Sequence, residues 1–112
     1  MKLYFYILDS DRKTGKWNLR LEECEVIEKP KTYKAVTRFP KGIYIGYVKK
    51  EYVGRILDPL TPYIVLTVPN YQFVKDKFLE KYNVEISRLK KSIAMYEDKI
   101  AAVKDYKEDT KC

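Results

Sequence analysis

The sequence predicts an α+β fold, in which an antiparallel sheet of four to five strands is followed by one long C-terminal helix. Two observations support this fold class. Residues 1–69 contain short apolar or alternating runs, separated by turns rich in proline, glycine and aspartate. From residue 71 to about 107 the chain has no proline or glycine, and apolar residues recur with helical spacing. A length of 112 residues fits a single domain, with a sheet region (1–69) and a long helix with a polar tail (70–112).

The runs in the first 69 residues differ in which faces are apolar. Residues 2–8 are apolar on both faces, which is typical of a central strand. Residues 17–28 alternate, but their apolar side chains change face near Glu22 and Glu23, which predicts a bulge or bend. At residues 32–39 basic side chains interrupt the alternation, so we expect an edge strand there. Two further strands are expected at residues 43–49 and 63–68. Residues 51–57 fit either a short helix or a strand.

The long helix is expected to begin after Asn70, a residue type that caps helix N-termini. Eight apolar residues then recur at alternating spacings of three and four, a 3.5-residue period typical of coiled coils. We call them the seam: Leu79, Tyr82, Ile86, Leu89, Ile93, Tyr96, Ile100 and Val103. Such a helix would be roughly 55 Å long, which exceeds the diameter of so small a domain. The seam therefore predicts a homodimer, and a break near Asn83 that folds the helix back on itself is the alternative.

The formal net charge of +7 is concentrated in one segment. Residues 29–50 carry seven basic side chains and no acidic one, with aromatic rings interleaved. Ammonium and guanidinium groups neutralise phosphates or acidic protein surfaces, and exposed rings stack on unpaired bases. We expect the binding face to comprise Lys29, Lys31, Tyr33, Lys34, Arg38, Lys41, Tyr44, Tyr47, Lys49 and Lys50.

Several residue types needed for chemistry are scarce. The chain has no histidine, so the commonest general base and metal ligand is missing, and its two cysteines cannot make a structural zinc site. We expect a protein that is not an enzyme, with no cofactor and no metal. Few cysteines favour reduced thiols and a cytoplasmic location, and Cys24 should be a buried hydrophobe. No apolar run approaches the roughly 20 residues of a membrane span, so no membrane association is expected.

Residues 42–54, GIYIGYVKKEYVG, resemble the signature of GIY-YIG nucleases. In that family two tyrosines, an arginine and a metal-binding glutamate cleave phosphodiester bonds. The resemblance implies two motif tyrosines, one arginine and a choice of two glutamates, namely Tyr44, Tyr52, Arg55, and Glu80 or Glu85. The two halves of the motif are closer together than in the family, and two prolines follow where the family has a helix.

Taken whole, the chain resembles small accessory proteins encoded by phages and mobile elements of low-GC bacteria. The features that carry the resemblance are a tyrosine-rich opening strand (KLYFYIL), an acidic second strand (EECEVIEKPKTY), a lysine-rich third stretch and a charged terminal helix. Anti-CRISPR and other anti-defence proteins are among these small accessory proteins. The resemblance implies a non-catalytic inhibitor that binds a host protein or ribonucleoprotein in a nucleic-acid-handling defence complex. Direct binding of DNA or RNA by residues 29–50 is the first alternative, and a degenerate GIY-YIG-like nuclease is the second.

Overall fold

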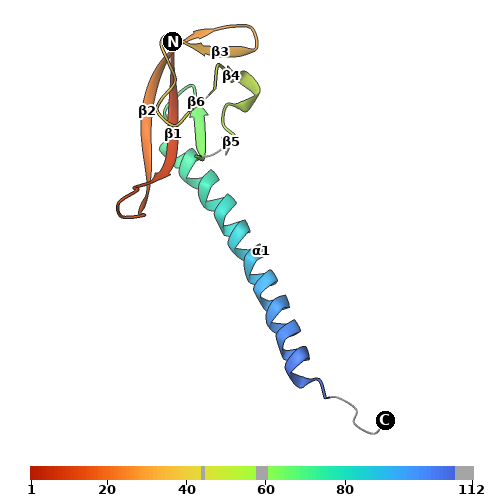
Figure 1. The fold of residues 1–112 in the computed structure, drawn as a ribbon. Helices are drawn as coiled ribbons and strands as arrows, with labels where there is room; N and C mark the ends of the chain where they lie inside the picture. The colour runs from red at the N-terminus through yellow and green to blue at the C-terminus, as the bar shows by residue number, and fades with distance from the viewer. Residues whose placement is uncertain (44, 58–60, 108–112) are drawn as a thin grey trace. The chain divides into compact units, whose positions relative to one another are not determined.

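The computed structural model describes residues 1–43, 45–57 and 61–107 (Figure 1). The chain forms two compact units, Met1–Lys77 and Phe78–Cys112. Its elements, in chain order, are β1 (Lys2–Ser10), β2 (Trp17–Glu28), β3 (Thr32–Ala35), β4 (Val48–Lys49), the 3-10 helix η1 (Lys50–Tyr52), β5 (Ile56–Leu57), β6 (Tyr63–Leu66) and α1 (Tyr71–Asp105). In the described residues, an antiparallel sheet of six strands followed by one long helix confirms the predicted α+β fold, with one strand more than expected.

The strands lie in the order β4-β3-β2-β1-β6-β5, and every neighbouring pair is antiparallel. β1 is central, as its apolar faces predicted, because β2 and β6 flank it. The prediction that residues 32–39 form an edge strand is wrong. β3 covers only Thr32–Ala35, and β4 pairs with its outer side through Tyr33 and Val48, so that β4 is the edge.

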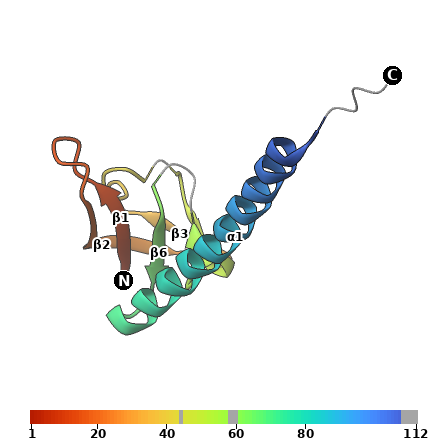
Figure 2. The ribbon, with the colours of Figure 1, turned by 90° about the horizontal axis from the view of Figure 1, so that it is seen from below.

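β2 pairs with β1 along its first part and with β3 at its end, and it contains no bulge where it pairs with β1. Residues 17–25 pair with β1 in one uninterrupted register, from Ser10 opposite Trp17 to Lys2 opposite Glu25. The strand then exchanges partners, and Val26, Ile27 and Glu28 pair with β3. The result is the curled sheet seen in Figures 1 and 2. The continuous register shows that the bulge predicted near Glu22 and Glu23 is absent, and the strand changes its partner only after Glu25.

Both faces of the central strands are buried, and each has its own set of apolar side chains. One face carries the main hydrophobic core, to which strands and loops contribute Leu3, Phe5, Ile7, Cys24, Val26, Tyr33, Phe39, Ile43, Val48, Tyr63 and Val65. The other face carries Tyr6, Ile64 and Leu66, also buried. The first turns of α1 lie along this second face beside β6 (Figure 2), and the side chain of Val74 there is fully buried.

The start of α1 follows the predicted capping chemistry. The side-chain oxygen Oδ1 of Asn70 accepts a hydrogen bond of 3.1 Å from the backbone N–H of Phe73, so Asn70 is the N-cap. The helix then runs without interruption to Asp105. The alternative of a break near Asn83 is therefore wrong, since that residue lies inside a continuous helix.

Candidate binding surface

Residues 36–47, between β3 and β4, form what we call the basic loop; residue 44 lies outside the described residues. The sequence predicts a strand over 43–49, but of the described residues in this range only Val48 and Lys49 form one. The reason is that Phe39 and Ile43 turn inward and are buried in the main core, with the ring centroids of Phe39 and Phe5 5.6 Å apart. The side chains of Phe39 and Ile43 therefore anchor the loop to the core, although the loop is not itself a strand.

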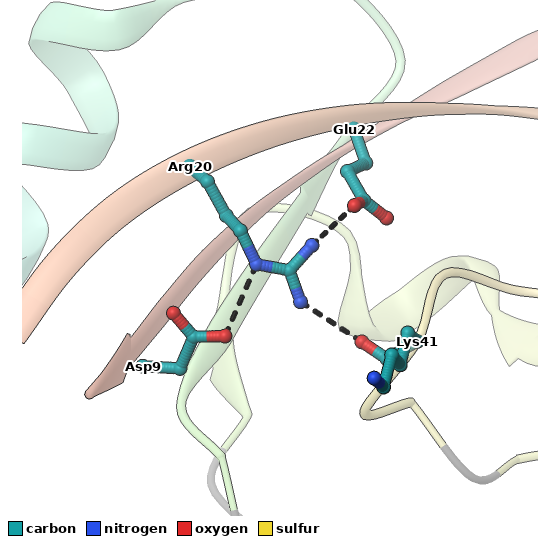
Figure 3. A network of polar contacts seen from close by, with 4 residues as sticks. All are labelled: Asp9, Arg20, Glu22 and Lys41. Carbon is teal, nitrogen blue, oxygen red and sulfur yellow. Dashed lines mark hydrogen bonds and ion pairs between the residues drawn. The ribbon is translucent and has the colours of Figure 1, made fainter. Parts of the chain in front are cut away.

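The side chain of Arg20 holds the same loop by bonding to the loop's backbone (Figure 3). The guanidinium Nη2 donates a hydrogen bond of 2.9 Å to the carbonyl oxygen of Lys41. The other two nitrogens hold carboxylates: Nε donates to Asp9 at 3.1 Å, and Nη1 donates to Glu22. The two carboxylates pair with the half-buried guanidinium and fix its orientation, so that Nη2 is directed at the loop. Arg20 was not among the predicted site residues. Its signal in the sequence is the alternation of β2, which places it on the same face as Cys24, where a charged side chain needs partners.

Cys24 makes a further tie between β2 and the basic loop. Its thiol is buried, as predicted, and lies 3.4 Å from the carbonyl oxygen of Arg38, to which it donates. Desolvation by burial, aided by the charge of Glu25, raises the pKa of the thiol above its ordinary value. The group is thus kept protonated, as a weak donor to the loop backbone, and is a poor nucleophile.

The basic residues predicted to bind fall into two groups. Side chains that are open to solvent are those of Lys29, Lys31, Lys34, Arg38 and Lys41. Lys49 and Lys50 are half-buried and already engaged. Nζ of Lys50 donates to Glu28 at 2.7 Å and lies 5.3 Å from the ring centroid of Tyr33, while Nζ of Lys49 lies 5.5 Å from that of Tyr52.

The tyrosines of the predicted face differ in their exposure to solvent. The ring of Tyr33 is buried in the core, so it supports the surface from beneath and is not open to stacking. Tyr47 is exposed, so a partner can reach its ring. Tyr44 lies outside the described residues.

Two hollows contain four of the five open cations, and Lys29 lines neither of them. The first has a volume of about 680 Å³, and its lining includes Lys34, Arg38 and Lys41 beside Ile43 and Ile45. We call it the loop groove. The second hollow, of about 560 Å³, is lined by Pro30, Lys31, Thr32, Tyr47, Lys49, Lys50 and Glu51. The structure thus brings Lys34, Arg38 and Lys41 together in one place and Lys31, Tyr47, Lys49 and Lys50 in another.

The residues implied by the nuclease resemblance are arranged differently from that family's pattern. Arg55 precedes the short strand β5, whereas the family places its arginine on a helix. Ile43 is a buried loop residue and Tyr52 ends the 3-10 helix η1, so the two halves of the motif do not lie on paired strands. Within the described residues, no three acidic or cysteine side chains are grouped closely enough to hold a metal ion.

No protein-family model matches this chain, and neither the curated proteins nor the solved structures give a match.

In the part of the chain that the structure describes, no helix combines the length and the apolar character that crossing a membrane requires.

Proposed function

We propose that this protein is a non-catalytic binder, encoded by a phage or mobile element, that inhibits a host nucleic-acid-handling defence complex. The contact is made by the basic loop, and the partner is an acidic surface of a host protein or ribonucleoprotein. The origin and the inhibitory role rest on the resemblance of the whole sequence to that class of small proteins. The choice of surface rests on the geometry of the loop.

One observation supports this choice of surface most strongly. The backbone carbonyls of Arg38 and Lys41 are held from within by Cys24 and Arg20, while the side chains of Arg38 and Lys41 are exposed. The backbone positions of Arg38 and Lys41 are therefore fixed before a partner binds. Ordering long charged side chains and their loop costs free energy on binding, and a loop fixed in advance reduces that cost.

The apolar residues beside these cations favour a protein surface over bare nucleic acid. Val36 and Ile45 are exposed on the same loop, and Ile45 lines the loop groove with Lys34 and Arg38. Phosphates require only cations, but a protein interface combines an apolar centre with charged groups that are complementary across it. An acidic surface with an apolar centre fits the loop groove best.

A phage plating assay tests the proposal. The protein is expressed in bacteria that carry one of a panel of nucleic-acid-guided or nucleic-acid-sensing defence systems, and phage plating efficiency is measured. We expect the wild type to restore plating against at least one system. The variant Lys34→Glu/Arg38→Glu/Lys41→Glu should lose this effect, because it reverses the three cations of the loop groove.

The matched control reverses three exposed cations in the β1–β2 turn, Arg12→Glu/Lys13→Glu/Lys16→Glu. Both triple variants lower the net charge by the same amount, so only a specific contact separates them. The control should restore plating as the wild type does. Failure of the wild type against every system would contradict the inhibitory role, and equal loss in both triple variants would contradict the chosen surface.

A second candidate function, direct binding of single-stranded nucleic acid, is favoured by the second hollow. There the exposed ring of Tyr47 lies beside Lys31 and Lys49, which is the combination of stacking ring and phosphate-binding cations that such proteins use. Titration of a labelled 30-nucleotide DNA or RNA at two salt concentrations tests it. A binder of this kind shows a log–log salt slope of several units and loses affinity in Tyr47→Ala more than in Tyr47→Phe. No binding at moderate salt would exclude it.

A further inference from the structure

The seam on α1 is an apolar stripe that stays open along the helix. Seven of its eight side chains are between 48% and 76% exposed, and only Tyr82 is half-buried. We infer that this seam pairs with the seam of a second copy of the chain, and that the two helices run antiparallel. The interface lies in the second unit, and the inference does not depend on the partner of the basic loop.

The exposed area is of the size that a dimer needs. Half-exposed side chains of this kind each present on the order of 100 Å², so the seam presents several hundred Å² per chain. A standard protein interface buries about 800 Å² on each partner. The 3.5-residue period keeps the stripe facing a partner helix over its whole length, because the two helices supercoil around each other.

The tyrosines of the seam favour the antiparallel direction. In heptad terms, positions a are Leu79, Ile86, Ile93 and Ile100, and positions d are Tyr82, Leu89, Tyr96 and Val103. A parallel pair would place each tyrosine opposite its own copy in a d layer of the core. An antiparallel pair combines a with d, which sets Tyr82 against Ile100 and Tyr96 against Ile86 of the second copy. Each bulky ring then packs on an aliphatic side chain, and the remaining layers are Leu79 with Val103 and Leu89 with Ile93.

The charges beside the seam differ between the two directions. In the antiparallel pair, Glu85 of each copy lies opposite Lys99 of the other, which gives two such contacts. The two copies of Lys90 lie opposite each other at the centre, which gives one contact. In the parallel pair Glu85 would meet Lys90 twice, but Lys99 would meet Lys104 twice. Like charges oppose pairing, so the antiparallel arrangement has two attractive contacts against one repulsive contact, whereas the parallel arrangement has two of each.

The charge of the first unit adds to the same preference. Residues 1–77 carry fifteen basic and nine acidic side chains, a formal net charge of +6. In an antiparallel pair the two copies of Lys77, where this unit joins the helix, lie roughly 40 Å apart along the pair at 1.5 Å per residue. The Debye length at physiological salt is about 8 Å, so this distance corresponds to several Debye lengths. A parallel pair would bring the two attachment points side by side.

Two single variants separate the directions, because they change dimer affinity in opposite senses. Lys90→Gln removes the central repulsion of the antiparallel pair, so its dissociation constant should fall. Lys99→Gln removes the contact with Glu85, so its dissociation constant should rise, by roughly three- to fivefold for two exposed ion pairs. A parallel pair predicts the reverse for both. Lys91→Gln is the matched control, since it removes the same charge from an exposed position that faces away from the seam, and it should leave the constant unchanged.

The measurement is sedimentation equilibrium of the full chain at low salt, repeated at 1 M salt, where the differences between these variants should vanish. A wild type that stays monomeric at 200 µM would overturn the inference. A tighter Lys99→Gln dimer with a weaker Lys90→Gln dimer, or no difference between the two at low salt, would overturn the antiparallel contacts. Ile93→Glu places a carboxylate in the centre of the seam and should give a monomer, and a dimer that survives this change would place the interface elsewhere.

Discussion

The carbonyl oxygen of Lys41 accepts a hydrogen bond of 2.9 Å from Nη2 of Arg20, a residue that precedes it by 21 positions on β2. The same guanidinium binds the carboxylates of Asp9 and Glu22, so one side chain joins β1, β2 and the basic loop. The loop carbonyl is thereby satisfied from the protein's own interior, and the Lys41 ammonium is left to face solvent.

Removing this guanidinium should loosen the loop while leaving the sheet folded. Arg20→Met keeps the apolar stem but deprives Asp9, Glu22 and the Lys41 carbonyl of their shared donor. We expect the free energy of unfolding to fall by about 1–3 kcal/mol, because half-buried carboxylates lose their cation. Hydrogen exchange of the loop amides should accelerate as well. Arg12→Met, in the exposed β1–β2 turn, is the control and should change neither quantity.

The loop also depends on its aromatic anchor. Phe39→Ala removes the ring that packs against Phe5, and such core truncations cost about 3–5 kcal/mol. Val36→Ala, on the same loop but with an exposed side chain, should cost no more than about 0.5 kcal/mol. Urea denaturation of the two variants compares them. Equal losses of stability would mean that Phe39 does not hold the loop.

The N-cap of α1 should be measurable by a pair of substitutions. Asn70→Ala removes the acceptor of the Phe73 N–H and should cost about 1 kcal/mol, the usual price of losing such a cap. Asn70→Asp keeps an acceptor oxygen and adds a negative charge at the positive end of the helix dipole. Its stability in thermal unfolding should equal or exceed that of the wild type. A destabilised Asp variant would show that the cap is not made by this side-chain oxygen.

The buried thiol predicts how stability depends on pH. The pKa of Cys24 is raised above its ordinary value of 9.0 by burial, so the folded state keeps the proton that the unfolded state gives up. The contribution of this thiol to the free energy of unfolding should therefore be constant below about pH 8 and become destabilising as the pH rises through 9, since deprotonation favours the unfolded chain. Burial raises the pKa of Tyr63 above 10.0 in the same way, which extends this decline in stability.

Denaturation curves of Cys112→Ser and Cys24→Ala/Cys112→Ser between pH 7 and 10 isolate the thiol. The variant without Cys24 should lose the part of the decline that begins near pH 9. Parallel pH profiles for the two proteins would contradict the burial of the Cys24 thiol.

Much of the fold follows from patterns that are local in the sequence. The two apolar faces of residues 2–8 predict the central position of β1, and Asn70 with the seam spacing predicts the start and the length of α1. These predictions succeed because burial on both faces and helical periodicity depend on the chain segment itself.

The basic loop could not be predicted in the same way. Residues 43–49 have the composition of a strand, but Ile43 is used as a core anchor and Gly42 adopts a positive φ of 95°, which turns the chain away from an extended path. Whether such a segment pairs depends on which neighbouring strand is free, and among its described residues only Val48 and Lys49 pair with β3. The contact of Arg20 with Lys41 is likewise long-range, and nothing in either segment alone indicates it.

The central claim is that the basic loop, held in shape by the core, is the surface that binds the partner. The most direct measurement is quantitative capture from a nuclease-treated bacterial lysate by the immobilised wild type and the two triple variants, read by mass spectrometry. We predict proteins that are enriched by the wild type and by Arg12→Glu/Lys13→Glu/Lys16→Glu but lost with Lys34→Glu/Arg38→Glu/Lys41→Glu. Capture of the same proteins in equal amounts by both triple variants would contradict the claim.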